Sequence, residues 1–303
     1  MAPDIIAKVE NLSKNFGGIS AVDNLTFDIR EKEIMGIIGP NGAGKTTVFN
    51  LITGVYKPTS GRIFLDGKEI TSLNPAVIVK KGISRTFQNI RLFNKLSVMD
   101  NVVTALDLNH PMYSIAESLF LNIPFADGKV KRSERRLREM ALKYLDMVGV
   151  SHFAGSRADS LPYGYQRKLE IARALALEPR LLLLDEPAAG MNPEESMELA
   201  RLIQNIKREC DITILLIEHH MDLIMYLCQH IIVMNFGAEL AQGTPAEIQA
   251  NPAVLTAYLG EGPEPARAVE SPEPVRAVER PKPACVGEGP EAIHPAKGPE
   301  DIA

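Results

Sequence analysis

The architecture of this chain can be worked out from nine consecutive residues, Gly39-Pro40-Asn41-Gly42-Ala43-Gly44-Lys45-Thr46-Thr47. Residues 33–38 before them predict a strand, and residues 45–53 predict a helix that follows directly. Between a strand and a helix, such glycines let backbone N–H groups turn inward around phosphates. Lys45 can then neutralise the β- and γ-phosphates, and the Thr46 hydroxyl can bind Mg²⁺. The flanking elements favour this interpretation over a chance glycine-rich turn, so the sequence predicts a nucleoside triphosphate site.

A second motif carries the acids that such a site needs. The run Leu181-Leu182-Leu183-Leu184-Asp185-Glu186 predicts a buried strand that ends in two carboxylates. Asp185 is suited to contact Mg²⁺ through a water molecule, and Glu186 can polarise the water that attacks the γ-phosphate. A GTPase is disfavoured because the chain has no N-K-x-D motif for guanine, and a small-molecule kinase rarely separates its two motifs so widely.

The hydrophobic pattern of residues 1–260 predicts an α/β fold. Apolar runs without alternation near residues 36, 183, 215 and 232 are typical of parallel strands buried on both faces. The earlier strand-like runs alternate, and Asp66-Gly67 predicts a hairpin turn, so we expect a separate antiparallel β-subdomain.

The stretch from about residue 89 to residue 178 predicts an inserted helical subdomain. Ser97 is the predicted N-cap of a helix that ends near Leu108, and Ser133 that of a helix that ends near Met147. A third helix is predicted over 167–177. The expected fold is therefore a P-loop core with an antiparallel β-subdomain and a helical insertion.

Composition restricts the class of protein further. Hydrophobic residues make up 45% of the 303 residues and charged residues 23%, as in soluble globular proteins. A net charge of −5 argues against a dedicated nucleic-acid binder. No signal peptide or membrane span is visible, and three scattered cysteines suggest a reducing compartment. We therefore expect a cytoplasmic location and no nucleic-acid partner.

The composition changes after about Gly260. Nine of the 21 prolines lie in residues 261–303, where Glu264–Glu270 is nearly repeated as Glu273–Glu279. Such a segment cannot bury enough apolar area to offset the entropy of ordering it. We expect a domain over 1–260 and a Pro- and Glu-rich disordered tail over 261–303.

Further motifs follow one another in a definite order and support a family resemblance. They are Phe16, Thr86-Phe87-Gln88-Asn89, Leu161-Pro162-Tyr163-Gly164-Tyr165-Gln166, Gly190-Met191-Asn192-Pro193 and Leu216-Ile217-Glu218-His219. Together with the two motifs above, they make residues from about 4 to 259 resemble the nucleotide-binding subunit of an ABC transporter. Several ordered motifs are far more specific than any one of them.

The resemblance implies roles that the residues alone do not. Phe16 would stack on adenine, whereas the residues alone favour a ring that covers the antiparallel sheet. Gln88 would contact Mg²⁺, and the His219 imidazole would hydrogen-bond the γ-phosphate and sense hydrolysis. His220 is left out of the site. The catalytic candidates are thus Glu186, His219 and Lys45, the metal candidates Thr46, Gln88 and Asp185, and the remaining nucleotide-binding candidates Phe16, Gly39, Pro40, Asn41, Gly42, Ala43, Gly44 and Thr47.

The resemblance also implies partners. The chain would bind ATP and Mg²⁺, dock on integral-membrane permease subunits at the inner face of the cell membrane, and pair with a second ABC ATPase. The motif set is most similar to the larger, LivG-type ATPase of branched-chain amino-acid importers, which also depend on a substrate-binding protein. Transporters of amides, urea or lipopolysaccharide remain alternatives, as does, less favoured, a soluble ABC ATPase.

Two departures from the family pattern stand out. Pro162 and Tyr163 replace the serine and glycine that most members carry, while Gly164 is retained. Asn192 replaces the usual aspartate. Pro162 supplies neither a hydroxyl nor an N–H donor, so this chain's contribution to a neighbouring ATP site is expected to be weaker.

Overall fold

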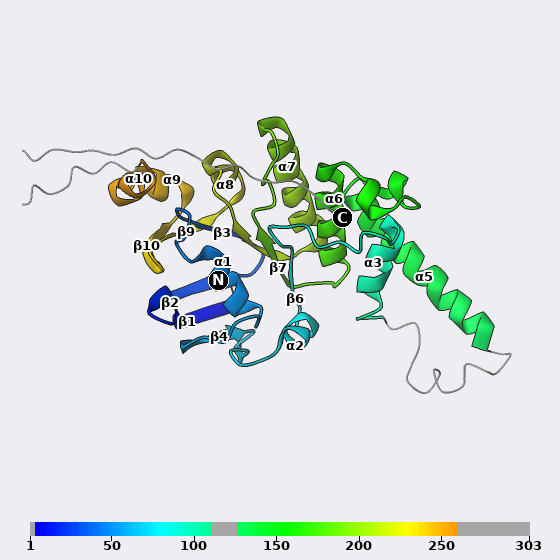
Figure 1. The fold of residues 1–303 in the computed structure, drawn as a ribbon, viewed down its shortest axis with the longest axis horizontal. Coiled ribbons are helices and arrows are strands. Elements are labelled where there is room, and N and C mark those ends of the chain that lie inside the picture. The colour runs from blue at the N-terminus through cyan, green and yellow to red at the C-terminus, as the bar shows by residue number, and fades with distance from the viewer. Residues whose placement is uncertain (1–3, 111–125, 260–303) are drawn as a thin grey trace, which may run out of the picture. The chain divides into compact units, whose positions relative to one another are not determined.

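The structure, a computed structural model, describes residues 4–110 and 126–259, so the predicted tail lies outside the described residues. The described residues form one compact unit. Two sheets and a set of helices build this unit (Figure 1). The predicted α/β architecture is confirmed.

The larger sheet has six strands in the order β10-β9-β3-β8-β7-β6. Five strands are parallel: β3 (Ile34–Ile38), β6 (Ile83–Arg85), β7 (Leu181–Asp185), β8 (Thr213–Ile217) and β9 (His230–Asn235). β10 (Ala238–Gly243) closes one edge as the antiparallel partner of β9. The four apolar runs predicted as parallel strands are β3, β7, β8 and β9.

The parallel strands read as continuous apolar runs because both faces of the sheet are covered. On β7, Leu182 and Leu184 pack into a cluster with the helices of one face, whereas Leu181 and Leu183 pack into the cluster on the other face. That second cluster also contains Val48 and the apolar residues of the smaller sheet. Because successive side chains of a strand point to opposite faces of the sheet, each strand contributes to two separate cores.

The smaller sheet is antiparallel, in the order β2 (Ile19–Arg30), β1 (Ile5–Phe16), β4 (Ser60–Leu65) and β5 (Lys68–Glu69). Asp66 and Gly67 join β4 to β5 with φ of 50° and 69°, the left-handed pair that a two-residue hairpin requires. Helix α1 (Lys45–Ile52) lies between the two sheets (Figure 1). The predicted β-subdomain and its hairpin are confirmed.

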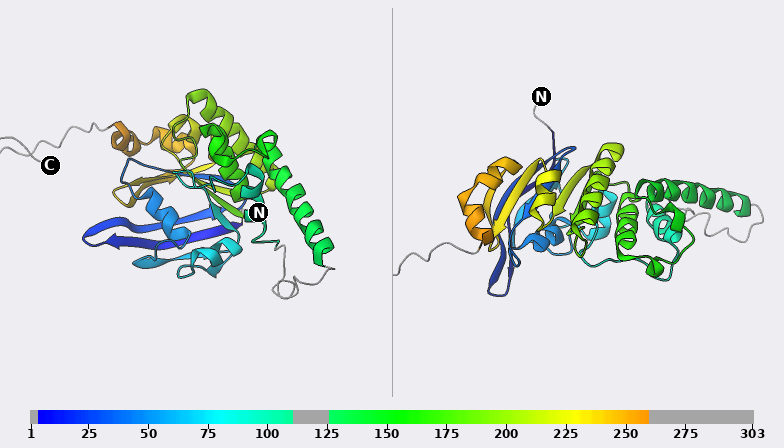
Figure 2. Two further views of the ribbon diagram at one scale, coloured as in Figure 1. Left: turned by 45° about the vertical axis from the view of Figure 1, so that its right-hand side comes forward. Right: turned by 90° about the horizontal axis from the view of Figure 1, so that it is seen from above.

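The remaining helices cover the large sheet or form the insertion. They are α2 (Pro75–Lys80), α3 (Val98–Leu106), α5 (Ala126–Met147), α6 (Tyr163–Leu175), α7 (Pro193–Cys210), α8 (Met221–Leu227), α9 (Pro245–Ala250) and α10 (Pro252–Leu259), with 3₁₀ turns at Ser151–Phe153 and Ala158–Ser160. α3, α5 and α6 pack together at one end of the unit (Figure 2). Within the described residues, no helix is both long enough and apolar enough to span a membrane.

The helix boundaries test the capping predictions. Ser97 caps α3 as expected, because its side chain accepts the N–H of Asp100 at 3.0 Å. The Ser133 prediction is wrong: α5 begins at Ala126 and Ser133 lies inside it. Good helix formers such as Lys129 and Lys131 continue the helix upstream of that serine. α6 also begins earlier than predicted, at Tyr163, with Pro162 as its N-cap.

Candidate functional site

The loop at 39–47 connects β3 to α1 and opens onto a cavity of about 290 Å³. The cavity is lined by Ala21, Asn41, Gly42, Ala43, Gly44, Lys45, Thr46, Thr47, Gln88 and Glu186. Residues more than a hundred positions apart therefore meet at one place. Eight of these ten residues were predicted from the sequence as candidates for the nucleotide site, and Glu186 was predicted as the catalytic base.

The backbone of this loop is shaped for close approach. Gly44 has φ of 98°, and a Cβ there would overlap the carbonyl oxygen of Ala21. Only glycine fits this position without displacing that strand. No side chain caps the first turn of α1, so its N–H groups remain open to an anion.

The Lys45 ammonium lies folded over the loop. It donates to the carbonyl oxygens of Gly39 at 2.7 Å and Pro40 at 3.0 Å, and the residue is only 6% exposed. Burial lowers the pKa of Lys45, while the nearby Glu186 and Asp185 oppose that shift. A bound phosphate would add negative charge beside the Lys45 ammonium and so oppose the lowering of its pKa.

Asp185 ends β7 and is almost fully buried. Its Oδ2 accepts a hydrogen bond from Arg85 Nη2 at 2.5 Å, and the same guanidinium donates to Asn50 Oδ1 on α1 at 2.7 Å. The rings of Phe49 and Phe87 lie within 5.4 Å of the guanidinium carbon. Arg85 thus ties the helix after the phosphate loop to the strand that carries Asp185.

The other carboxylate oxygen of Asp185, Oδ1, is buried and has no hydrogen-bond partner among the described residues. A buried oxygen of this kind is costly unless a donor or a cation satisfies it. Oxygen ligands are what Mg²⁺ prefers, usually with several retained waters. The donor set of Thr46, Gln88 and Asp185 therefore fits a hydrated Mg²⁺ ion.

Glu186 lies one residue further, where three candidate side chains converge. The Gln88 amide donates to Glu186 Oε2 at 2.7 Å, and His219 Nδ1 lies 4.0 Å from the same oxygen. The Glu186 side chain is 14% exposed and that of His219 is 47% exposed. The side chains of Glu186, Gln88 and His219 are thus brought together at one place.

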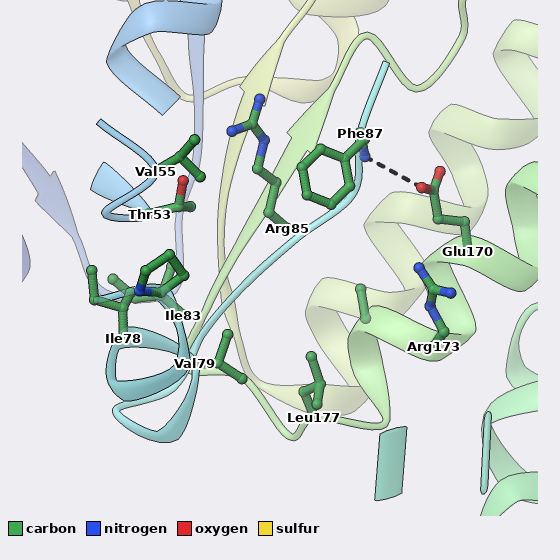
Figure 3. Close-up of a pocket in the computed structure, with 12 residues that line it drawn as sticks. Thr53, Val55, Ile78, Val79, Ile83, Arg85, Phe87, Glu170, Arg173 and Leu177 are labelled. Carbon is green, nitrogen blue, oxygen red and sulfur yellow. Dashed lines mark hydrogen bonds between the residues drawn. The ribbon is translucent and has the colours of Figure 1, made fainter. Parts of the chain in front are cut away.

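The segment that carries Gln88 is held by the helix of the Leu161–Gln166 motif. Arg167 on α6 donates to the carbonyl oxygens of Phe87 at 2.6 Å and Gln88 at 2.7 Å. Glu170, one turn along, accepts the N–H groups of Phe87 at 3.4 Å and Arg91 at 3.2 Å. Figure 3 shows the Phe87–Glu170 contact. The helical insertion therefore holds the backbone on both sides of Gln88.

A second cavity, of about 230 Å³, lies beside this contact (Figure 3). Arg85, Phe87, Glu170 and Arg173 line it, together with apolar side chains from α2 and Val55 of the segment just after α1. It shares no lining residue with the loop cavity. It lies at the junction of the core and the helical insertion.

Phe16 lies apart from the other candidates. It ends β1, is 42% exposed, and makes an edge-to-face contact with Tyr56 at 5.2 Å between ring centroids. It is not among the residues that line the loop cavity. His220, which the sequence left out, places its Nδ1 3.0 Å from Glu218 Oε2.

Sequence reasoning missed three functional neighbours: Arg85, Arg167 and Glu218. Arg85 and Arg167 are buried beside the site, and Glu218 is fully buried between the loops that carry Glu186 and His219. Arg85 and Asp185 are a hundred residues apart, so spacing could not pair them. Of the three, Glu218 alone offered a signal, as a charged residue directly beside an apolar strand run.

A parallel sheet with a glycine-rich loop after β3 and a pair of acids at the end of β7 defines a P-loop nucleotide-binding protein. Comparison with known proteins narrows the class. The family model described as "ABC transporter" matches residues 22–189, and the model described as "Branched-chain amino acid ATP-binding cassette transporter" matches residues 239–264. The chain belongs to the ABC transporter family, as an ATP-binding cassette.

Individual relatives agree with this placement. The chain is 46% identical to the high-affinity branched-chain amino acid transport ATP-binding protein BraF of Pseudomonas aeruginosa, over 84% of this chain and 98% of that protein. It is 42% identical to the corresponding LivG protein of Escherichia coli, with 84% and 98% covered. A solved ATP-binding cassette of an ABC transporter in its ADP conformation superposes with a TM-score of 0.72 at 32% identity, covering 85% of this chain and all of that one.

Proposed function

We propose that this chain binds and hydrolyses ATP to energise an ABC importer for branched-chain amino acids. The observation that carries the proposal is that Gln88 and Glu186 both line the phosphate-loop cavity and contact each other, with His219 Nδ1 4.0 Å from Glu186 Oε2. The names of the BraF and LivG relatives supply the substrate class.

Each residue has a task in this mechanism. Lys45 exchanges the carbonyls of Gly39 and Pro40 for the β- and γ-phosphates, while the loop N–H groups and the first turn of α1 hold the remaining phosphate oxygens. Glu186 orients the attacking water and accepts its proton. His219 hydrogen-bonds the γ-phosphate and reports its loss.

The metal site belongs to the same proposal. Thr46, Gln88 and Asp185 would hold Mg²⁺, which supplies compensation for the charge that develops on the phosphates. Arg85 keeps one Asp185 oxygen engaged, so that the other, Oδ1, would be available to the hydrated ion. Phe16 would stack on adenine. Because the Lys14 Nζ lies over one face of the Phe16 ring, 5.0 Å from its centroid, adenine would use the opposite face.

The partners follow from the same assignment. We infer that the cassette, residues 1–260, pairs with a second ABC ATPase so that each of two ATP molecules lies between one chain's phosphate loop and the other chain's Leu161–Gln166 motif or its equivalent. It would dock on integral permease subunits at the inner face of the cell membrane and act indirectly with a substrate-binding protein. Residues 261–303 would form a separate tail.

Reconstitution of the chain with its permease and ATPase partners in vesicles tests the proposal. Glu186→Gln should keep Mg-ATP binding but lose ATP turnover and leucine uptake, because the amide cannot accept the water's proton. Lys45→Ala should lose binding at micromolar ATP. Uptake of urea or an amide in place of leucine would overturn the substrate class, and full turnover by Glu186→Gln would overturn the assignment of the base.

A further inference from the structure

Glu218 is a fully buried acid that the proposed mechanism does not use. It follows β8 directly and precedes the candidate sensor His219, with a side chain that is 0% exposed. A buried carboxyl group is costly unless hydrogen bonds or a cation compensate it. Its partners therefore indicate what it is there to hold.

The two oxygens of Glu218 contact two different loops. Oε1 accepts the N–H of Ala188 at 2.9 Å, two residues after Glu186. Oε2 accepts the N–H of His219 at 3.1 Å and lies 3.0 Å from His220 Nδ1. One side chain thus joins the loop after the base to the loop of the sensor.

The loop after the base needs such support. Glu186 has φ of 46°, a left-handed conformation that costs a residue with a side chain roughly 1–2 kcal/mol. Conformations of this kind persist where surrounding contacts fix them, often at functional sites. Here the Glu186 N–H donates to Ile217 O at 2.9 Å, and the Ala188 N–H is held by Glu218.

An ordinary buried salt bridge does not account for Glu218. Among residues 4–110 and 126–259, its ion-pair contacts are with His219 and His220, and no lysine or arginine contacts it. Its hydrogen bonds go mainly to backbone N–H groups on each side of the site. What these contacts fix is the relative position of the two loops.

We propose that Glu218 is a positioning residue that fixes the catalytic base Glu186 and the sensor His219 relative to each other. The proposal rests on the ATPase function proposed above. It predicts that Glu218 governs the rate of ATP hydrolysis and leaves ATP binding to the phosphate loop, because no atom of Glu218 lines the loop cavity.

The test compares Glu218→Ala and Glu218→Gln with the wild-type chain in the assembled transporter. Glu218→Ala loses both loop contacts, so kcat should fall about 10- to 100-fold, the usual loss when a residue that orients a catalytic group is removed. The KM for ATP should stay within about twofold of the wild-type value, since uniform binding is untouched. In Glu218→Gln, only one oxygen remains to accept, so kcat should be intermediate.

Glu33→Ala is the matched control. Glu33 is also a buried carboxyl group that accepts a backbone N–H, that of Arg30 at 3.0 Å, but it lies at the opposite, amino-terminal end of the sheet. Its removal should leave kcat unchanged in the folded protein. An equal loss of kcat in Glu33→Ala would reduce the Glu218 effect to general destabilisation and overturn the proposal.

A double-substitution cycle adds a readout that a merely structural role would not move. If Glu218 acts through His219, Glu218→Ala should cost less kcat in a His219→Ala background than in the wild type. Fully additive losses would overturn the link to His219. Should Glu218→Ala fail to fold, Glu218→Gln decides: wild-type kcat in that variant overturns the proposal. A wild-type complex without ATPase activity would instead refute the proposed function.

Discussion

At the scale of single residues, the site holds the buried positive charge of Lys45, which the phosphates of a nucleotide would compensate. Lys45 is buried against two carbonyl oxygens, and burial lowers its pKa below the ordinary lysine value of 10.5. The folded chain therefore binds fewer protons at Lys45 than the unfolded chain just below pH 10.5. On this count alone, stability should rise with pH across that interval.

Nucleotide binding should reverse the shift at Lys45. Anionic phosphates favour the charged ammonium and raise its pKa, so Mg-ATP binding in alkaline buffer below pH 10.5 should take up protons. Calorimetry in buffers of different ionisation enthalpy measures this uptake. The uptake should shrink as the buffer pH is lowered, because a larger fraction of Lys45 is then protonated before the nucleotide binds. Binding without uptake in the alkaline buffer would place Lys45 away from the phosphates.

Arg85 offers a second test at this scale. Its side chain is 5% exposed and that of its partner Asp185 is 1% exposed. Arg85→Met leaves a buried carboxylate without its partner, so the free energy of unfolding should fall by about 3–5 kcal/mol in urea titrations. Arg135→Met is the control: its pair with Glu139 is exposed on α5 and is worth about 0–1 kcal/mol. Similar losses of unfolding free energy in the two variants would show that the Arg85–Asp185 ion pair does not have the structural role assigned to it.

At the scale of helices and strands, prediction succeeded where the signal is local. Continuous apolar runs identified the parallel strands because an apolar residue at each position indicates that both faces of the strand are buried. Ser97 identified the start of α3 because a cap acts within one helical turn. Ser133 failed as a cap since serine also occurs inside helices, and the helix formers Lys129 and Lys131 precede it. Pro162 starts α6 without any side-chain cap, so no capping signal was present to read.

Asn192, one of the two departures from the family pattern, has a clear role as an element boundary. It is the N-cap of α7: its side chain accepts the N–H of Glu195 at 2.9 Å, and Glu195 in turn accepts the Asn192 N–H at 3.0 Å. This reciprocal pair is a capping box. Asparagine and aspartate cap helices about equally well, so the replacement conserves the start of the helix.

Substitutions at Asn192 should distinguish the contribution of the helix cap to stability from the contribution of charge. Asn192→Ala should lower the free energy of unfolding by about 1 kcal/mol because the Glu195 N–H loses its side-chain acceptor. Asn192→Asp should keep the wild-type melting temperature, since it retains the acceptor and places a negative charge at a helix N-terminus. Thermal melts of the three proteins measure this. A wild-type melting temperature in Asn192→Ala would show that the box contributes nothing.

At the scale of the whole molecule, the sequence predicted which residues gather but not how they are held. The loop at 39–47 and the acids after β7 were found from their motifs, and the parallel sheet brings them together. The holding contacts come from partners far apart in sequence, such as Arg167 with Phe87 and Glu218 with Ala188. Such pairs depend on sheet order and helix packing, which no local pattern encodes.

The assembled transporter should be functionally asymmetric. In the proposed pair of ATPases, the Leu161–Gln166 motif of this chain completes the site on the partner. Pro162 is the N-cap of α6 and offers no hydroxyl or N–H donor. The loss of one such donor typically costs about 2.7–4 kcal/mol of transition-state stabilisation. Gly164, where an added Cβ would meet open space, keeps its backbone free to approach phosphate and offsets part of that loss.

The site that holds this chain's own Lys45 and Glu186 should therefore be the stronger catalyst, provided that the partner ATPase carries a serine at the position of Pro162. Glu186→Gln in this chain should then reduce leucine transport more than the equivalent substitution in the partner, because it disables the site with the fuller set of donors. Transport by reconstituted complexes with one substitution at a time measures the difference. Restoring the donor with Pro162→Ser should shift the balance toward the partner's site. Equal losses from the two single glutamine substitutions would refute the asymmetry and leave the assignment of Glu186 as the base intact.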